Sequence, residues 1–484
     1  MSTKPLWAAR GELTDSDSEN PSEELTEVVC LESDLQDGQM MEVEVGHHGV
    51  LLTRSGGKYS AIGNQCTHYG APLSKGFISG NRVRCPWHGS CFNVHTGDLE
   101  EYPGIDCLPC HKVHIQNSKV YVSINKKTLR QEKRIKRMGT AVPGVTHTVL
   151  LLGGGAASLS CAETLRQENF GGRIIMVTRE DLLPYDKTRL SKVMNVESDS
   201  ILMRRMEFFH QYDIEVWLRK EALSVDTDKK TVTFDDGSVQ SYDQLLISTG
   251  CRAKGLDVPG MNLGNIKMLE TPEDRNVKFY MNDSVTEIRG VNGKVKEVVL
   301  KSGKVIPAEV LIVGIGTMPN SEYLKDSKIQ MTSKNFVKVD KYMHTNVPDV
   351  FCGGDLAMFP LAIAKNRMVN IGHWQMAQAQ GRIVALNMLN KTTELNSVPF
   401  YWTVLVGKTI RYTGYGEGYT ELVIKGQFED RKFLALYIKD EEVIAAAGLN
   451  FDPAVSAVAE RLATGKVITK DEAQSDDLSW LQLS

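Results

Sequence analysis

The sequence predicts a multidomain protein with an all-β domain first, an α/β domain next and a smaller α+β domain last. Its 484 residues correspond to roughly three domains at about 150 residues per domain. In residues 27–125, short alternating apolar runs lie between Gly and Asn turns, which is typical of β-strands. From residue 147 strand-like runs alternate with helical patterns, and from residue 396 hairpin-like runs precede a helix predicted at Ala454–Ala463.

Charge and composition exclude several classes of protein. The 56 Lys and Arg residues nearly balance the 60 Asp and Glu residues, so we predict neither a nucleic-acid partner nor a disordered polyelectrolyte. The most apolar stretch, Val149–Ser158, is too short to cross a bilayer, and no membrane span is predicted. Nine irregularly spaced cysteines are typical of reduced thiols and metal ligands, which favours an intracellular, reducing compartment.

Two segments are expected to lie outside the folded domains, an N-terminal arm and a linker. Residues 1–26 lack the pattern of a secretory signal, and the acids in Asp15–Glu19 oppose a mitochondrial presequence, so a disordered arm is expected. Residues 126–146 begin with a run of Lys and Arg and end in a stretch that contains Gly139 and Pro143. Such a segment is typical of a solvated linker between domains.

The most specific motif places one cysteine and one histidine in each of two loops. Cys66-Thr-His68 and Cys85-Pro-Trp-His88 are separated by sixteen residues inside the β domain. In a Rieske [2Fe–2S] centre, two cysteines bind one iron and two histidines bind the other. A structural zinc site accepts the same ligand types, but zinc fingers commonly pair Cys with Cys and His with His along the chain. The mixed order favours a Rieske cluster with Cys66, His68, Cys85 and His88 as ligands.

The segment Leu31–Ile124 resembles the Rieske ferredoxins and oxygenases, including the run Phe92–Gly97 after the second motif. High-potential Rieske proteins carry an extra cysteine in each loop, and Ala71 and Trp87 occupy those positions here. The resemblance therefore implies a cluster without a disulfide, in the lower half of the Rieske potential range. It also implies that the Ser90 hydroxyl donates a hydrogen bond to a cluster sulfur.

A glycine turn follows a buried strand at the start of the α/β region. The strand ends at Leu152 and leads into Gly153-Gly-Gly155-Ala-Ala-Ser158 and a helical pattern, which aims free helix N–H groups at a pyrophosphate. Gly153 makes the tight turn, Gly155 lets the backbone approach a phosphate, and Ser158 replaces the usual third glycine. The next strand should end in an acid for the ribose hydroxyls, and it offers Thr178 first and Glu180 two residues later, which leaves this contact open.

Four downstream segments resemble the FAD-dependent pyridine-nucleotide oxidoreductases, in the branch of the ferredoxin reductases and apoptosis-inducing factors. In chain order they are Leu183–Lys192, Tyr242–Gly250, Val350–Asp355 and Gly372–Gly381. With the Rieske-type domain in front, the chain is most similar to Rieske-containing members of that branch. The resemblance implies an FAD-binding domain in two parts, residues 147–270 and 326–395. It also implies an interface domain at residues 396–484, and the sequence leaves open whether the protein forms an oligomer through this domain.

The resemblance carries cofactor roles onto individual residues. It implies that Lys192 lies beside the flavin as a catalytic residue and that Asp355 bonds the ribityl chain. The helix starting near Trp374 would direct its positive end at the flavin pyrimidine, and Trp402 would lie near the flavin edge. The full expected FAD-binding set is Gly153, Gly155, Ser158, Lys187, Lys192, Thr249, Gly250, Asp355 and Trp374.

One block of the family plan is missing. The family inserts a second dinucleotide fold to bind NAD(P)H, and Leu269–Arg275 is the usual entry to it. Here the chain passes directly to Asn276–Met281, which resembles strands late in that insert, and on the order of 70 residues are absent. Residues 271–325 are therefore expected to be a truncated remnant with unpaired sheet edges and an uncovered apolar face. A deletion, a splice form and a gene-model error are equally compatible with this pattern.

The resemblance implies an FAD-dependent oxidoreductase of the NAD(P)H-to-FAD-to-[2Fe–2S] type. The missing insert implies that the NAD(P)H half-reaction of this chain is impaired. The alternative is a cofactor-binding regulatory protein of the apoptosis-inducing-factor type, without turnover. The sequence leaves the electron acceptor open, and the resemblance implies a cytoplasmic or mitochondrial compartment.

Overall fold

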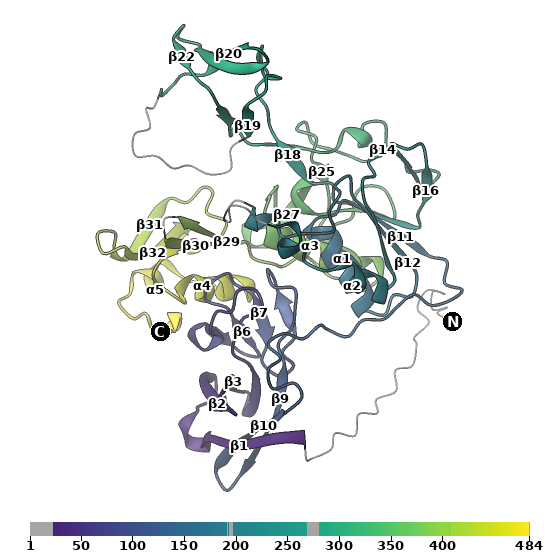
Figure 1. The fold of residues 1–484 in the computed structure, drawn as a ribbon. Coiled ribbons are helices and arrows are strands. Elements are labelled where there is room, and N and C mark those ends of the chain that lie inside the picture. The colour runs from purple at the N-terminus through teal and green to yellow at the C-terminus, as the bar shows by residue number, and fades with distance from the viewer. Residues whose placement is uncertain (1–22, 191, 193–196, 269–279, 406, 484) are drawn as a thin grey trace.

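The computed structural model describes residues 23–190, 192, 197–268, 280–405 and 407–483. It contains an N-terminal β domain at one end, a central α/β domain, a C-terminal α+β domain, and a lobe that projects from the central domain at the other end (Figure 1). This arrangement confirms the expected fold class. In the described ranges, no helix is both long and apolar enough to cross a membrane.

The N-terminal domain consists of two antiparallel sheets with a small core against each. The larger sheet has, in spatial order, β1 (Glu24–Leu31), β10 (Lys119–Asn125), β9 (Cys110–Gln116), β4 (Lys58–Gly63), β3 (His48–Ser55) and β2 (Gln39–Val45). The smaller sheet has β5 (Phe77–Ser79), β6 (Arg82–Arg84), β7 (Cys91–Asn93) and β8 (Leu99–Glu101). Residues 24–26, expected in the arm, belong to β1 because they pair with the end of β10.

A parallel sheet forms the centre of the α/β domain. Its order is β13 (Ile214–Trp217), β12 (Arg173–Val177), β11 (Thr148–Leu152), β17 (Gln244–Ile247) and β26 (Val350–Cys352). Helices α1 (Ala156–Gln167) and α3 (Trp374–Met388) pack against each other, and α2 (Met206–Gln211) precedes β13. The smaller sheets are β14 (Ala222–Asp226), β15 (Thr231–Phe234) and β16 (Val239–Ser241), and β25 (Val337–Lys338), β27 (Ala357–Leu361) and β28 (Arg367–Val369).

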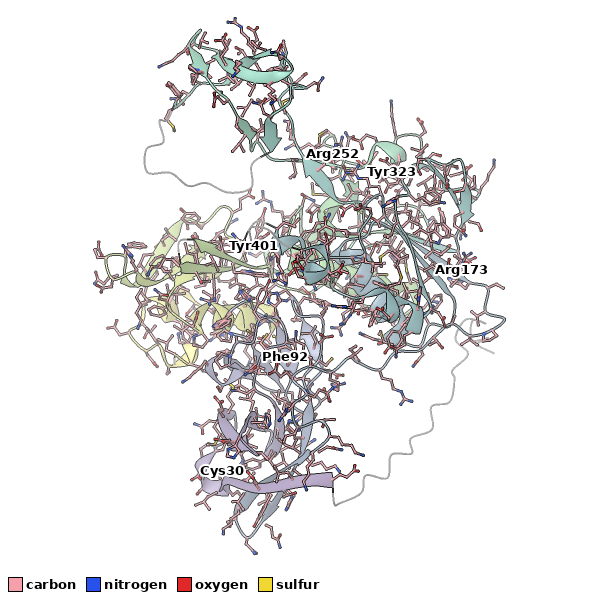
Figure 2. The ribbon with its side chains drawn as sticks, viewed as in Figure 1. Cys30, Phe92, Arg173, Arg252, Tyr323 and Tyr401 are labelled. Atoms are coloured by element: carbon pink, nitrogen blue, oxygen red, sulfur yellow. The ribbon has the colours of Figure 1, made fainter. Side chains whose placement is uncertain are left out.

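The lobe contains most of the described part of the segment expected to be a remnant, residues 271–325, whereas Leu269–Arg275 lies outside the described residues. Antiparallel strands β18 (Cys251–Ala253) and β24 (Thr317–Pro319) join it to the central domain, where Arg252 and Tyr323 lie (Figure 2). Its other strands are β19 (Ile266–Met268) with β23 (Leu311–Val313), and β20 (Val285–Val291), β21 (Lys294–Leu300) and β22 (Val305–Pro307). Large apolar side chains are exposed at β23, with Val310, just before the strand, at 57% and Ile312, on the strand, at 50%. The lobe therefore presents uncovered apolar surface.

The C-terminal domain is one antiparallel sheet with two helices. The sheet has the order β29 (Phe400–Leu405), β30 (Lys408–Gly414), β33 (Glu442–Leu449), β32 (Lys432–Lys439) and β31 (Glu421–Gln427). The predicted helix at Ala454–Ala463 is confirmed with the same bounds as α4, and α5 spans Lys470–Gln474. Buried residues of α4 pack with β32 and β33 in one core.

A buried ion pair joins the N-terminal domain to the C-terminal domain. Arg84 on β6 donates hydrogen bonds from Nε and Nη2 to Oε2 of Glu460 on α4, at 3.0 and 2.8 Å. Arg82 Nε lies 3.4 Å from the other oxygen of the same carboxylate. The Arg84 and Glu460 side chains are 3% and 2% exposed. Because water does not reach either side chain, each charge is stabilised mainly by the other.

A second buried ion cluster joins the N-terminal domain to the central domain. Arg204 donates to Asp106 at 2.8 Å and to Glu163 of α1 at 2.7 Å. Phe92 lies at the end of the N-terminal domain that faces these contacts, and Cys30 lies at the far end (Figure 2). The N-terminal domain is thus held on two sides.

Replacing Glu460 with Gln should destabilise the docked N-terminal domain by about 3–5 kcal/mol, because it leaves buried arginine charge without its carboxylate. Denaturant unfolding followed domain by domain measures this loss. Glu394→Gln is the matched control, because Glu394 pairs with Lys341 at the surface and such pairs contribute about 0–1 kcal/mol. Equal effects of the two substitutions would contradict the role of the buried pair.

Candidate functional site

The two cysteines of the predicted cluster site lie together in the N-terminal domain. Cys66 follows β4 and Cys85 follows β6, and both side chains are buried. The Cys85 thiol and the Ser90 hydroxyl both hydrogen-bond to the Cys66 sulfur, and these bonds lower the pKa of Cys66. Burial raises the pKa of Cys85. The Ser90 hydroxyl thus lies beside the sulfur of a predicted cluster ligand.

The two histidines form a second pair beside the cysteines. Nδ1 of His68 lies 3.1 Å from Nδ1 of His88, so the same ring atom of each imidazole faces a common point. Burial is the main cause that lowers the pKa of His68 to about 4 and that of His88 to about 3. Both rings are therefore neutral near pH 7, which is the form that binds iron.

These four side chains fit a binuclear cluster in donor type and pairing. Nowhere in the described ranges do three or more His, Cys, Asp or Glu side chains gather as a site for a single metal ion requires. The thiols form one pair and the imidazoles another, as the two irons of a Rieske cluster require.

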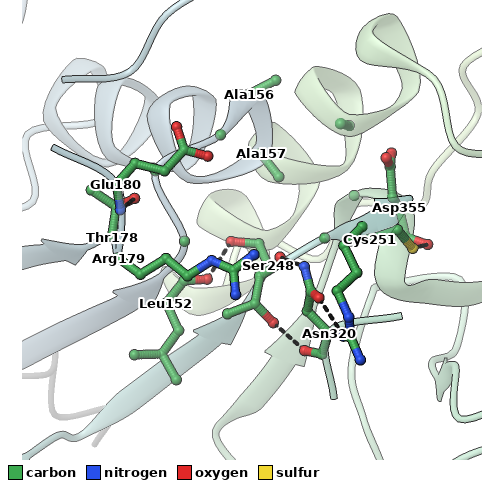
Figure 3. Close-up of a pocket in the computed structure, with 18 of the residues that line it drawn as sticks. Leu152, Ala156, Ala157, Thr178, Arg179, Glu180, Ser248, Cys251, Asn320 and Asp355 are labelled. Atoms are coloured by element: carbon green, nitrogen blue, oxygen red, sulfur yellow. Dashed lines mark hydrogen bonds between the residues drawn. The ribbon is translucent and has the colours of Figure 1, made fainter. Parts of the chain in front are cut away.

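A cavity of about 870 Å³ opens at the carboxyl ends of the parallel strands in the central domain. Seven of the nine predicted FAD-binding residues line it. They are Gly153, Gly155, Lys187, Thr249, Gly250, Asp355 and Trp374. In the close-up, Glu180 and Asp355 lie on opposite sides of this cavity, with Ser248 between them (Figure 3). The topology therefore collects residues that are more than 200 positions apart in the chain.

The other two predicted residues lie elsewhere. Ser158 is buried inside α1, where its Oγ lies 2.8 Å from Oγ of Ser248, and Ser248 donates to the Leu152 carbonyl at 2.9 Å. The hydroxyl at the third glycine position is therefore satisfied at the contact between helix and sheet. Lys192 is exposed and is not part of the cavity wall. It is a single described residue in a segment whose flanking positions lie outside the described ranges.

The cavity also has lining residues that the motifs did not indicate. Arg252 donates to the side-chain oxygen of Asn320 at 2.7 Å, and the side-chain nitrogen of Asn320 donates to the Thr249 carbonyl at 3.1 Å. Thr249 Oγ1 lies 3.0 Å from the Tyr323 hydroxyl, which closes the same side of the wall. Asn320 and Tyr323 follow the lobe in sequence, so only the pairing of β18 with β24 brings them to the cavity.

The cavity wall fits an elongated dinucleotide. The N-termini of α1 and α3 both open into it, through Gly155 and Trp374. A Cβ added at Gly155 would meet no atom within 4 Å, so the backbone faces open space where a pyrophosphate would approach. Burial raises the pKa of Asp355, whose carboxyl group faces the cavity from the opposite side.

An aromatic side chain of the C-terminal domain connects the two sites. The ring of Trp402 on β29 lies 4.7 Å from that of His88 and 5.9 Å from that of His68, between ring centroids. The ring of Trp402 also lies 5.3 Å from that of His373, which lines the cavity and donates from Nε2 to the Phe400 carbonyl at 2.7 Å. His68, His88, Trp402 and His373 therefore form a continuous series of ring contacts from the cluster loops to the cavity.

Replacing Gly155 with Ala should leave folding intact and weaken FAD binding by about tenfold or more, equivalent to about 1.4 kcal/mol. The new methyl group would contact no protein atom but would occupy the space facing the pyrophosphate, and the backbone φ of −94° suits alanine. Fluorescence titration with FAD and thermal unfolding measure the two effects. Gly153→Ala is the contrasting variant, because its φ is 117° and its Cβ would lie 2.2 Å from the Ser248 carbonyl oxygen. Gly153→Ala should therefore disrupt the turn and lower the stability of the domain. Wild-type FAD affinity in Gly155→Ala would contradict the assignment of the pyrophosphate site.

Comparison with known families divides the chain into three matched parts. The Rieske [2Fe–2S] domain profile matches residues 26–112. The pyridine nucleotide-disulphide oxidoreductase profile matches residues 147–276 and again 268–381. The reductase C-terminal profile matches residues 400–481.

Solved structures share the fold of the reductase part. The ferredoxin reductase for the CYP199A2 system of Rhodopseudomonas palustris superposes with a TM-score of 0.63 at 23% identity, over 69% of this chain and 98% of that one. The covalent putidaredoxin reductase–putidaredoxin complex gives a TM-score of 0.64 at 19% identity, over 70% of this chain and 98% of that one. These similarities establish the reductase fold.

Apoptosis-inducing factor 3 of Homo sapiens is 42% identical over 538 residues, which cover 96% of this chain and 89% of that protein. Because 96% of this chain is about 465 residues, about 70 aligned positions have no residue here. Rubredoxin-NAD(+) reductase of Pseudomonas putida is 25% identical over 62% of this chain and 95% of its own length. The cofactors of the chain are accordingly a [2Fe–2S] cluster and FAD. The chain therefore belongs to the family of apoptosis-inducing factor 3, and it joins an N-terminal Rieske domain to a pyridine nucleotide-disulphide oxidoreductase domain.

Proposed function

We propose that this chain is an oxidoreductase in which FAD and the Rieske cluster exchange electrons directly within one polypeptide, while its own NAD(P)H half-reaction is impaired. The observation that carries this proposal is the series of ring contacts through Trp402, from His68 and His88 to His373 in the cavity wall. When bound, the flavin accepts a hydride or electron pair and releases electrons singly, and the cluster accepts one electron at a time.

The proposed cluster ligands are Cys66 and Cys85 for one iron and His68 and His88 for the other. The pairing of the thiols and of the imidazole Nδ1 atoms supports this division. Burial keeps both imidazoles neutral and available as donors. The His–His edge faces Trp402, so the domain contact covers the side of the cluster from which electrons would enter or leave.

For FAD we propose that Gly153 and Gly155 carry the pyrophosphate at the start of α1, and that α3 directs its N-terminus at the flavin ring. Two helix N-termini on one cavity support this, because each offers free N–H groups and a partial positive charge. Asp355 would hold the ribityl chain, with Thr249 and Gly250 beside it. Lys187 bonds Glu180 at 2.9 Å, which would position both at the polar end of the site.

The impaired NAD(P)H step rests on the missing block. The oxidoreductase profile matches in two pieces that meet at residues 268–276, and the human relative has about 70 more aligned positions than this chain. The exposed apolar side chains at β23 support the loss of neighbouring structure. The catalytic role expected of Lys192 lacks support, because that side chain is exposed and outside the cavity wall.

The presence of the Rieske domain and the reductase part in one polypeptide also indicates which group first accepts electrons from the flavin. The names of two reductase relatives, a rubredoxin-NAD(+) reductase and the ferredoxin reductase component of a chlorobenzene dioxygenase, mention a rubredoxin or ferredoxin. In this chain the iron–sulfur domain is already attached and docked, so a separate ferredoxin is not needed as the first acceptor of flavin electrons.

Anaerobic photoreduction should bleach both the flavin and the Rieske absorption bands of the purified holoprotein, whereas NADH should bleach them at least about 100-fold more slowly than in a full-length relative. The reason is that the residues that would hold the nicotinamide against the flavin are missing, and such positioning accounts for large rate factors. Stopped-flow absorbance measures both rates. Rapid bleaching by NADH would contradict the impaired half-reaction, and two bound cofactors that no donor reduces would indicate the regulatory alternative.

Replacing Trp402 with Leu should slow the arrival of electrons at the cluster after flash photoreduction of the flavin, because it removes the ring between His88 and His373. Transient absorbance measures this rate. Trp480→Leu is the matched control in the same domain, where the ring stacks against Arg461. An unchanged rate in Trp402→Leu, with both cofactors bound, would contradict the proposed path.

A further inference from the structure

The second cluster loop is held by the C-terminal domain as well as by its own domain. Arg411 on β30 donates from Nε to the Trp87 carbonyl at 2.7 Å, and Ser456 on α4 donates to the Cys85 carbonyl at 2.8 Å. Trp87 directly precedes His88, so both bonds act on the backbone that carries proposed ligands. A different domain therefore fixes one side of this loop.

Arg411 and Trp402 approach the cluster loops together. They are directly opposite each other in the ladder between β29 and β30, which places their side chains on the same face of the hairpin. Trp402 contacts the two histidine rings, and Arg411 reaches the backbone between Cys85 and His88. One hairpin thus supplies both the ring contact and a positive charge.

The charge of Arg411 is poorly solvated. Its side chain is 9% exposed, and its Nη1 lies 3.0 Å from Oδ1 of Asp452. The guanidinium lies between the carboxylate and the loop, since it bonds Trp87 on one side and Asp452 on the other. Lys133 is also positive and acts on His68, but it is exposed, so solvent and salt screen it.

We propose that Arg411 is a positioning residue that raises the reduction potential of the Rieske cluster, and that Asp452 opposes it. Reduction adds one electron, hence one negative charge, to the cluster. A nearby buried cation stabilises that charge and a nearby carboxylate disfavours it. This inference rests on the proposed ligand set. Since Arg411 belongs to another domain, the potential becomes a property of the docked chain.

Redox titration of the full-length holoprotein at one pH, followed by the cluster's visible and electron paramagnetic resonance signals, tests the proposal. Arg411→Met should lower the potential, because it removes the cation and leaves Asp452 unpaired. Asp452→Asn should raise it, and the double variant should lie between the two. Arg411→Lys should stay near the wild-type potential, because it keeps the charge. Arg461→Met is the control, because Arg461 forms a comparable pair with Glu472 within the same domain.

Shifts of opposite sign in the two single variants cannot arise from loosened docking alone, which would move the potential in one direction. Equal shifts, or no shift, in Asp452→Asn and Arg411→Met would overturn the proposal. If Arg411→Met fails to assemble a cluster, Asp452→Asn against Arg411→Lys still decides, since both conserve side-chain volume near the wild type. A wild-type protein without a Rieske spectrum would instead refute the ligand set, which is a distinguishable failure.

Discussion

Burial of the Glu460 carboxylate between Arg82 and Arg84 is the constraint on which the rest of the arrangement depends. The Arg84 and Glu460 charges have left water, while Arg82 is 27% exposed, and either fully buried charge without its partner would cost several kcal/mol. The N-terminal domain can therefore dock only where β6 meets α4. That register brings the second cluster loop under Ser456 and Arg411 and sets Trp402 against the histidines.

The second ion cluster, around Arg204, fixes the remaining freedom. Asp106 belongs to the N-terminal domain and Glu163 to α1, so one guanidinium bonds two domains at once. Two charged contacts on different sides of a domain define an orientation, whereas apolar contacts alone tolerate sliding. Burying these groups costs free energy, but it specifies a single geometry between the cluster loops and the cavity.

Local patterns predicted the fold class and most of the residues that line the cavity. The Cys–His spacing located the cluster loops, and the glycine turn located the start of α1, because both depend on residues close in sequence. Helix α4 was predictable from its apolar periodicity. The contacts of Trp402 and Arg411 with the cluster loops were not, since more than 300 residues separate the partners and no short pattern records a domain interface. Asn320 and Tyr323 reach the cavity only through the strands at the base of the lobe. Lys192 illustrates the reverse, because its position in a family motif did not place it in the cavity wall.

The linker between the domains is itself held down. The backbone of Arg134 forms an isolated β-bridge with that of Cys107, and its side chain bonds Asp98, the Thr96 carbonyl and the Leu108 carbonyl. The basic segment therefore runs along the surface of the N-terminal domain and is fixed to it. Separate reductases and ferredoxins must meet by diffusion, at rates that depend on protein concentration and on charge steering that salt weakens. An exchange confined to one docked chain has no such encounter, and its rate would be set by the distance between two fixed sites, in dilute or saline surroundings alike.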